Sequence, residues 1–219
     1  DRYQNAEITA IDLSSSSICY AQRKINEYGI KNVEFVQMDI LDLADLKKKF
    51  DIIESCGVIH HMKKPSDGLC SLLDVLKEDG LLKLGLYSEL ARLDIVKARE
   101  IISSNNIEPT LEGIRYFRKR ILSGEFEELN QLVNWSDFYT TSMCRDLCFH
   151  VKEHRYTIKE LENLINSFKL EFLGFILESR IKRDYSKNFP NDKAQIKLDN
   201  WDKFELSNPN TFKAMYQFW

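Results

Sequence analysis

The chain begins with an alternation of short apolar runs and segments of helical spacing. Four runs of strand length stand at residues 7–13, 33–39, 50–55 and 81–88, each bounded by Ser, Asp or Gly. After the first run, apolar residues recur at helical spacing, at Ile18, Ala21, Ile25 and Tyr28. Because strands alternate with helices, the pattern predicts right-handed crossovers and a mostly parallel α/β sheet with helices on both faces.

The predicted helices carry start and end signals of their own. A Ser cluster at 14–17 can cap the first helix, and Gly29 stands where a helix commonly ends. A second helix is predicted over 65–80, closed by its last glycine, and the stretch "LADLKKKF" before it predicts a short polar helix or a turn. Thr157 and Glu160 form a capping box that opens a later helix.

The pattern changes after Ser88. Apolar residues keep a helical spacing through 89–135 with no strand alternation, and the following stretch, 136–156, is dense in aromatic residues, histidine and arginine. A strand is predicted at 170–177, and a closing strand at the chain's end. We therefore predict three regions, namely a core over 1–88, a helical insert or lid on the substrate side over 89–156, and the rest of the core over 157–219.

Composition and charge exclude several classes of protein. A chain of 219 residues can bury a full core, and its net charge of −3 does not favour nucleic-acid binding. Charged residues interrupt every apolar run well before the ~18 residues of a membrane span, and no secretory leader opens the sequence. The five cysteines are odd in number and scattered, which favours a reduced, cytoplasmic protein.

Polar residues stand at the carboxyl ends of the predicted strands, where ligands bind to open parallel sheets. In chain order these strand ends are Asp12, Asp39, Ser55-Cys56-Gly57 and Tyr87-Ser88. Asp12 can accept hydrogen bonds from ribose hydroxyls, and Asp39 from the exocyclic amine of adenine. Alternatively, Asp12 favours a helix dipole and Asp39 opens a turn. Gly57 either lets a ligand approach the backbone closely or simply turns the chain.

His60 and His61 allow three interpretations: a metal pair, a general base, or the rim of a pocket at the start of a helix. Adjacent side chains point apart, and no nearby Asp, Glu or Cys completes a ligand set, so metal binding is not favoured. His61 is the candidate general base of the two.

A second polar cluster contains Cys144, Cys148, His150 and His154, which superficially resembles a zinc set. Cys148 and His150 are two positions apart and face different sides of a helix, so no metal site is predicted here. Buried thiols with hydrogen-bonded histidines, or substrate contacts, remain as the alternatives.

Around this cluster, Tyr139, Arg145 and His154 are candidate substrate contacts, together with Tyr87 at a strand end. Arginine can clamp a carboxylate or phosphate, and His150 is a second candidate base that could take a proton from an attacking amine or hydroxyl.

The stretches "ITAIDLS", "VEFVQMDILDL", "FDIIESCGVIHHMKKP" and "LKEDGLLKLGLYS" resemble class I S-adenosylmethionine-dependent methyltransferases. The resemblance is close over 6–88. It extends less specifically through "TSMCRDLCFHVKEHRYT" and "NPNTFKAMYQFW", which are similar to methyltransferases often attached to tetratricopeptide-repeat segments. It implies a Rossmann-like, seven-stranded sheet with an antiparallel last strand, and S-adenosylmethionine as the cofactor.

The resemblance also implies roles for the strand-end residues. Asp12, with Leu13 beside it, would hold the ribose, and Asp39 and Ile40 would frame the adenine. The methionine side would be lined by Cys56, Gly57 and Val58. His61 would lie close to the transferred methyl group.

The family's glycine-rich loop precedes the strand end that Asp12 matches, and the first glycine here is Gly29. We therefore expect the first strand of the family fold to be missing, the chain to be a fragment of a longer protein, and this fragment alone to bind cofactor poorly and to be inactive. A sheet without that strand would expose two edges. The resemblance implies a tetratricopeptide-repeat segment in the same full-length chain.

Three functions remain in competition. The first is methyl transfer to a nitrogen or oxygen of an unidentified small molecule or protein. The second is a methyltransferase-like domain that has lost catalysis and serves as a binding or scaffold module. The third is a nicotinamide-dependent oxidoreductase, which Asp12 would also suit, although the double histidine and the late helical insert favour it less.

Overall fold

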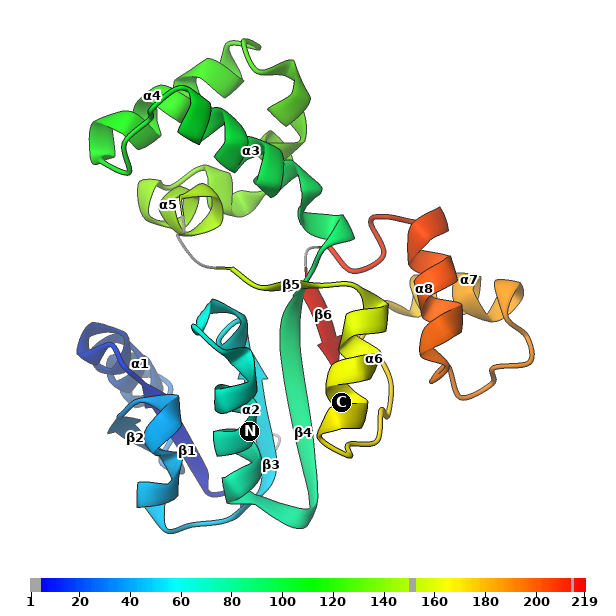
Figure 1. Cartoon of the computed structure of the whole chain (residues 1–219). Helices are drawn as coiled ribbons and strands as arrows, with labels where there is room; N and C mark the ends of the chain where they lie inside the picture. Colours follow the sequence, from blue (N-terminus) through cyan, green and yellow to red (C-terminus); the bar gives the residue numbers. More distant parts are fainter. Residues whose placement is uncertain (1–4, 150–152, 214) are drawn as a thin grey trace. The chain divides into compact units, whose positions relative to one another are not determined.

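The computed structural model describes residues 5–149, 153–213 and 215–219. The chain divides into two compact units. The first unit contains residues 1–53 and 64–82, and the second contains 54–63 and 83–219. Strands and helices of both are labelled in Figure 1.

The first unit is built on a parallel strand–helix–strand motif. β1 (Ile8–Asp12) pairs with β2 (Val33–Gln37), and α1 (Ser15–Glu27) connects them. Ser14 caps α1, because its Oγ accepts a hydrogen bond from the amide of Ser17 at 3.2 Å. Gly29, with φ of +67°, turns the chain out of the helix in the left-handed region. These features confirm the predicted strands, cap and helix end.

The second helix of this unit is shorter than the sequence predicts. After the 3₁₀ helix η1 (Ile40–Leu46) and the strand β3 (Phe50–Cys56), α2 (Pro65–Val75) begins with proline at its first position and contacts η1. The prediction that it reaches Gly80 is wrong. Leu76 already has extended backbone, and Lys77 pairs with Asp51 of β3 at 2.7 Å, so β4 (Leu76–Ser88) starts there.

β4 is the central strand of the second sheet. The strand order is β3-β4-β5, with β5 (Arg155–Tyr156) parallel and β6 (Met215–Phe218) antiparallel to β4. Gly85 lets β4 fit between its neighbours, since a Cβ there would stand 2.7 Å from Met215 Sδ and 2.9 Å from Cys56 Cα. The predicted antiparallel last strand is confirmed.

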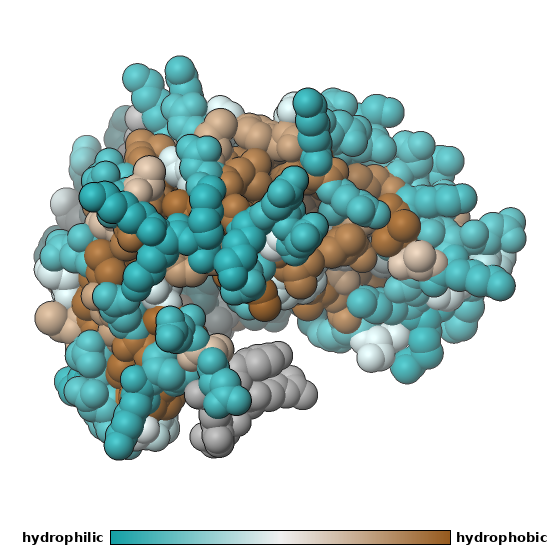
Figure 2. Space-filling model, turned by 90° about the horizontal axis from the view of Figure 1, so that it is seen from below, coloured by the Kyte–Doolittle hydropathy of each residue, from teal (hydrophilic) through white to brown (hydrophobic). Residues whose placement is uncertain are grey.

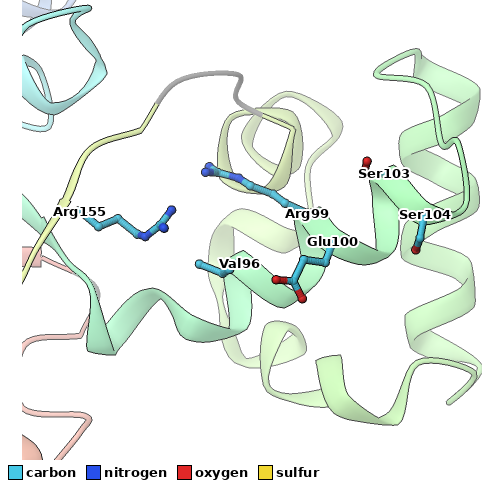
Figure 3. A pocket seen from close by; sticks show the side chains of 6 residues that line it. All are labelled: Val96, Arg99, Glu100, Ser103, Ser104 and Arg155. Carbon is cyan, nitrogen blue, oxygen red and sulfur yellow. The ribbon is translucent and has the colours of Figure 1, made fainter.

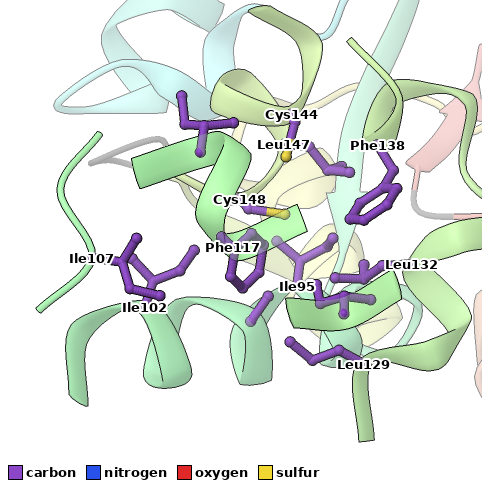
Figure 4. Packing of buried hydrophobic residues seen from close by; sticks show 13 residues of the cluster. Ile95, Ile102, Ile107, Phe117, Leu129, Leu132, Phe138, Cys144, Leu147 and Cys148 are labelled. Atoms are coloured by element: carbon purple, nitrogen blue, oxygen red, sulfur yellow. The ribbon is translucent and has the colours of Figure 1, made fainter. Parts of the chain in front are cut away.

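A helical segment follows β4 and has a core of its own. Its elements are η3 (Leu90–Arg92), α3 (Leu93–Ser104), α4 (Leu111–Leu122), η4 (Glu127–Asn134), η5 (Ser136–Phe138) and α5 (Thr141–Cys148). Figure 4 shows their apolar side chains gathered around Phe117, which is fully buried. Cys144 and Cys148 belong to this core as free thiols. The segment therefore folds around its own apolar contacts, as helical spacing predicts.

The C-terminal part returns to the sheet with three helices, α6 (Ile158–Ser167), α7 (Ser179–Asn188) and α8 (Leu198–Ser207). The capping box of Thr157 and Glu160 is present in full. The strand predicted at 170–177 is wrong in extent. Only Phe175 of this segment forms a β-bridge, to Phe218. The preceding residue, Gly174, has φ of +132° and interrupts the extended backbone.

The predicted α/β class, the helical segment after β4 and the mixed sheet are confirmed. The described residues form six strands, two in one sheet and four in the other, whereas the family sheet has seven strands, of which we expect the first to be missing from this chain. Residues 170–177, where a further strand was predicted, make a single bridge.

The surface is mixed. Figure 2 shows apolar surface between hydrophilic side chains, and the exposed large apolar residues include Ile8, Leu13, Tyr20 and Tyr28 of the first unit. Over the described part of the chain, no helix has the length and apolarity needed to cross a membrane.

Candidate functional site

The carboxyl edge of the first unit carries two carboxylates on adjacent parallel strands. Asp12 pairs with Gln37 in the β1–β2 register, so the two strands end level with each other. Asp12 is exposed, and its Oδ1 accepts from the amide of Ser14 at 2.8 Å. Asp39 follows β2 and caps η1, its Oδ1 accepting from the amide of Leu41 at 2.9 Å.

Asp39 thus performs the turn-opening role of its alternative interpretation, whereas Asp12 accepts from the amide of Ser14, the residue that caps α1. Each carboxylate still has lone pairs for further hydrogen bonds, because a carboxylate accepts about four. Leu13 is exposed beside Asp12, and Ile40 is half-buried beside Asp39. The structure therefore brings four of the predicted cofactor residues to one edge: Asp12, Leu13, Asp39 and Ile40.

The other predicted cofactor residues lie at the end of β3 in the second unit: Cys56 is its last residue, and Gly57 and Val58 follow it. Gly57 has φ of +80°, and its amide donates to the carbonyl of Gly85 at 3.1 Å. Before it, Ser55 is buried, and its Oγ has no hydrogen-bond partner among the described residues. The strand end is thus a sharp turn with an unsatisfied hydroxyl.

His60 is buried in an aromatic stack at the ends of β3 and β4. It lies in η2 (Ile59–His61), and its ring is 3.8 Å from that of Tyr87, at an interplanar angle of 28°. Burial first, and then the neighbouring His61, lower the pKa of His60 to about 3. His60 is therefore neutral at physiological pH.

His61 occupies a different position. It is half-buried, and its ring centroid lies 4.4 Å from that of His60 and 5.5 Å from that of Tyr87. The adjacent histidines therefore differ in environment, and His61 remains the candidate base of the two.

A buried ion-pair network supports this stack. The guanidinium of Arg92 lies 3.9 Å over the ring of Tyr87, and it binds Glu153 through Nε–Oε1 at 3.2 Å and Nη2–Oε2 at 2.5 Å. Arg99 Nη2 binds the same Oε2 at 2.7 Å. Burial alone would raise the pKa of Glu153, but the two arginines outweigh it and lower that pKa.

The sequence reasoning missed this network. Arg92 and Arg99 are seven positions apart, which is two turns of a helix. Their spacing therefore predicts that they lie on the same helix face. Glu153 stands in the polar stretch after them, but nothing in the spacing names it as their partner.

A second buried carboxyl was also missed. Glu205 of α8 accepts hydrogen bonds from Ser88 Oγ and Tyr216 OH, each at 2.7 Å. Burial raises its pKa, and nearby Asp202 adds to the shift, while the two hydrogen bonds oppose it. Ser88 is a predicted strand end, and its hydroxyl is committed to this carboxyl.

The remaining predicted residues are spread over the second unit. His154 is exposed, and its backbone amide donates a hydrogen bond to the carbonyl of His60 at 2.8 Å, so its backbone contacts a residue of the aromatic stack. Tyr139 donates its hydroxyl to the carbonyl of Val133 at 2.8 Å, and Arg145 is exposed on α5. His150 lies outside the described residues. Within the part that is described, no group of three or more Asp, Glu, His or Cys residues could hold a metal ion.

With this geometry in place, the comparisons with known proteins define the class. Residues 2–143 match the model of a methyltransferase domain family, and the chain belongs to that family. An uncharacterized protein of Synechococcus sp. is 31% identical over 92% of this chain and 51% of its own length. A malonyl-[acyl-carrier protein] O-methyltransferase of Acetivibrio thermocellus is 33% identical over 41% of this chain and 30% of its own length.

Among solved structures, PKMT2 from Rickettsia typhi matches 99% of this chain and 44% of its own chain, with a TM-score of 0.71 and 16% identity. That likeness shows the fold. The same protein is also solved in complex with AdoHcy, the product of S-adenosylmethionine. The chain spans about half the length of the Synechococcus protein and less than half of PKMT2.

S-adenosylmethionine, the cofactor predicted from the sequence, is thereby confirmed as the cofactor of this class of domain. The nicotinamide-dependent oxidoreductase considered above receives no support from these comparisons.

Proposed function

We propose that the protein containing this chain binds S-adenosylmethionine and transfers its methyl group to a nitrogen or oxygen of an acceptor molecule. The observation that carries the proposal is the level pair of parallel strands β1 and β2, which ends in the carboxylates of Asp12 and Asp39, in a chain of the methyltransferase domain family.

The chemistry of this edge fits an adenosyl group. Asp12 is exposed and keeps acceptor capacity, so it can take hydrogen bonds from both ribose hydroxyls. Asp39, one strand away, can accept from the exocyclic amine of adenine, and Leu13 and Ile40 offer apolar surface next to these acids. In the second unit, the orphaned Oγ of Ser55 and the turn at Gly57 are polar features of the kind that a bound ligand satisfies.

The cofactor, when bound, supplies a methyl group already activated by the positive charge on its sulfur. The residues of the chain then have two tasks: to hold the acceptor in line with that methyl group and to take the proton that the acceptor loses. We assign proton acceptance to His61, because it is half-buried at the stack, whereas burial holds the pKa of His60 at about 3. A nitrogen acceptor that is already deprotonated would not need it.

Calorimetry on the intact protein with S-adenosylhomocysteine tests the cofactor site. We expect micromolar binding, and Asp12→Ala should weaken it by about tenfold or more, because hydrogen bonds to a charged acceptor contribute roughly 1.5–3 kcal/mol. Asp45→Ala, which removes another exposed acid of the first unit, is the matched control and should leave the affinity within about twofold. Equal affinity of the Asp12 variant and the unchanged protein would refute the ribose assignment.

Methyl transfer from labelled S-adenosylmethionine, profiled over protein and metabolite pools, then identifies the acceptor. The association with a tetratricopeptide-repeat segment stays a prediction, which the full-length coding sequence answers directly.

A further inference from the structure

An open pocket of about 470 Å³ lies beside α3 in the second unit. Five lining residues come from α3 and one from β5, and they are Val96, Arg99, Glu100, Ser103, Ser104 and Arg155. Figure 3 shows Arg99 and Arg155 at one end, extending toward each other, and the two serines at the other end. None of these six residues has a role in the proposed cofactor site.

The arginine end of the pocket has an excess of positive charge. Arg92 and Arg99 share the carboxylate of Glu153, and Arg155 binds Glu89 through Nε–Oε2 at 2.8 Å. Arg155 also approaches Glu153 at 3.8 Å. Three guanidinium groups against two carboxylates leave one positive charge within this network.

That excess faces the pocket. The Arg92 and Glu153 side chains are 2% and 0% exposed, whereas Arg99 and Arg155 are 22% and 24% exposed. Arg99 Nε is buried and has no hydrogen-bond acceptor among the described residues. A buried donor without an acceptor is costly, so the hydrogen-bonding capacity of this guanidinium is not fully used within the described residues.

The pocket adjoins the aromatic stack. Arg155 is the register partner of Tyr87 between β5 and β4, and Tyr87 contacts His60 and His61. The arginine end of the pocket thus lies one strand away from the tyrosine that contacts both histidines.

We propose that this pocket binds the carboxylate of a small-molecule methyl acceptor, with Arg99 and Arg155 as its ligands. The acceptor role rests on the proposed methyltransferase function, whereas the anion site stands on the pocket itself. Planar guanidinium groups pair with carboxylates through parallel hydrogen bonds. The exposed carboxylate of Glu100 on the same lining opposes a second negative charge, so the pocket suits a monoanion better than a dianion such as phosphate.

Calorimetric titration of the intact protein with sodium benzoate tests the site, and benzamide serves as the uncharged isostere at constant ionic strength. We expect saturable benzoate binding at least about tenfold tighter than benzamide or inorganic phosphate. Arg155→Gln should weaken benzoate by about tenfold. Glu100→Gln should tighten it by about threefold, because it removes an opposing charge.

Arg115→Gln is the matched control, because Arg115 is exposed on α4 and does not line the pocket; benzoate affinity should stay within about twofold. Glu100→Gln replaces an exposed side chain, so it keeps the test valid if Arg155→Gln fails to fold. Equal binding of benzoate and benzamide, or weaker benzoate binding in Glu100→Gln, would overturn the anion site. Tighter binding of phosphate than benzoate would overturn the carboxylate assignment.

A failure of the proposed methyltransferase function and a failure of the proposed anion site give different experimental results. Arg155→Gln should leave S-adenosylhomocysteine affinity within about twofold. Benzoate binding without S-adenosylhomocysteine binding refutes the methyltransferase function and leaves the anion site standing, while the converse refutes the site alone. In profiling with labelled cofactor, methylated small carboxylates support the acceptor role, and products confined to uncharged molecules or proteins contradict it.

Discussion

At the end of β1 in the first unit, Asp12 is exposed and hydrogen-bonds to a backbone amide two residues away. At the end of β4 in the second unit, Tyr87 touches Arg92, which binds a glutamate 61 positions further along the chain. The end of β1 therefore exposes a polar side chain to solvent, whereas the side chain at the end of β4 belongs to a buried network.

The difference separates two uses of polar residues at a sheet edge. An exposed carboxylate without a protein partner costs little free energy, because water solvates it until a ligand binds. A buried carboxylate such as that of Glu153 needs permanent partners, so the main role of its arginines is to stabilise the fold. Only the arginines at the border of the buried network, Arg99 and Arg155, keep exposed surface for a ligand.

The largest expected effect comes from breaking the buried pair. Glu153→Gln leaves the guanidinium of Arg92 buried without its carboxylate, so the free energy of unfolding of the second unit should fall by about 3–5 kcal/mol. Tryptophan fluorescence during denaturation measures it, because all three tryptophans lie in that unit.

Asp51→Asn provides the contrast, since it removes one partner of the solvent-exposed pair between Asp51 and Lys77 in the first unit. The transition of the second unit should not change. If Glu153→Gln were as stable as the unchanged protein, the buried network would not hold the second unit together.

A smaller effect concerns acid pH. His60 has a pKa of about 3 in the folded chain and about 6.5 when unfolded. Between these two pH values the unfolded state binds a proton at His60 that the folded state does not bind. The contribution of neutral His60 to the free energy of unfolding is therefore present above pH 6.5 and is lost as pH falls toward 3. Between pH 7 and pH 5, the unchanged protein should lose about 2 kcal/mol relative to His60→Phe, which keeps a ring against Tyr87.

Denaturation curves at several pH values measure this difference. Charges that bear on His60 include those of His61, Glu153 and Arg92, and all three remain in the variant. Parallel curves for the unchanged protein and His60→Phe would show that His60 titrates normally.

The features predicted correctly from the sequence depend on residues that are neighbours along the chain. The β1–α1–β2 motif, the cap at Ser14, the end at Gly29 and the capping box at Thr157 depend on residues close together in sequence, and all were predicted. The position of Asp12 and Asp39 at strand ends was predicted for the same reason, because each ends an apolar run, and their role in cofactor binding stays a prediction.

Features that depend on distant residues were not predicted. Ser88 and Glu205 meet across 117 positions, and Arg92 and Glu153 meet across 61. The end of α2 at Val75 was missed because residues 76–80 belong to β4, whose pairing with β3 overrides their helical spacing. Local periodicity carries no information about which distant segment a side chain will meet.

A crystal structure of the intact protein with S-adenosylhomocysteine tests the proposed cofactor site most directly. We expect both ribose hydroxyls to lie within hydrogen-bond distance of the Asp12 carboxylate and the adenine amine to face Asp39. A ligand bound with its ribose away from Asp12 would refute the proposed site.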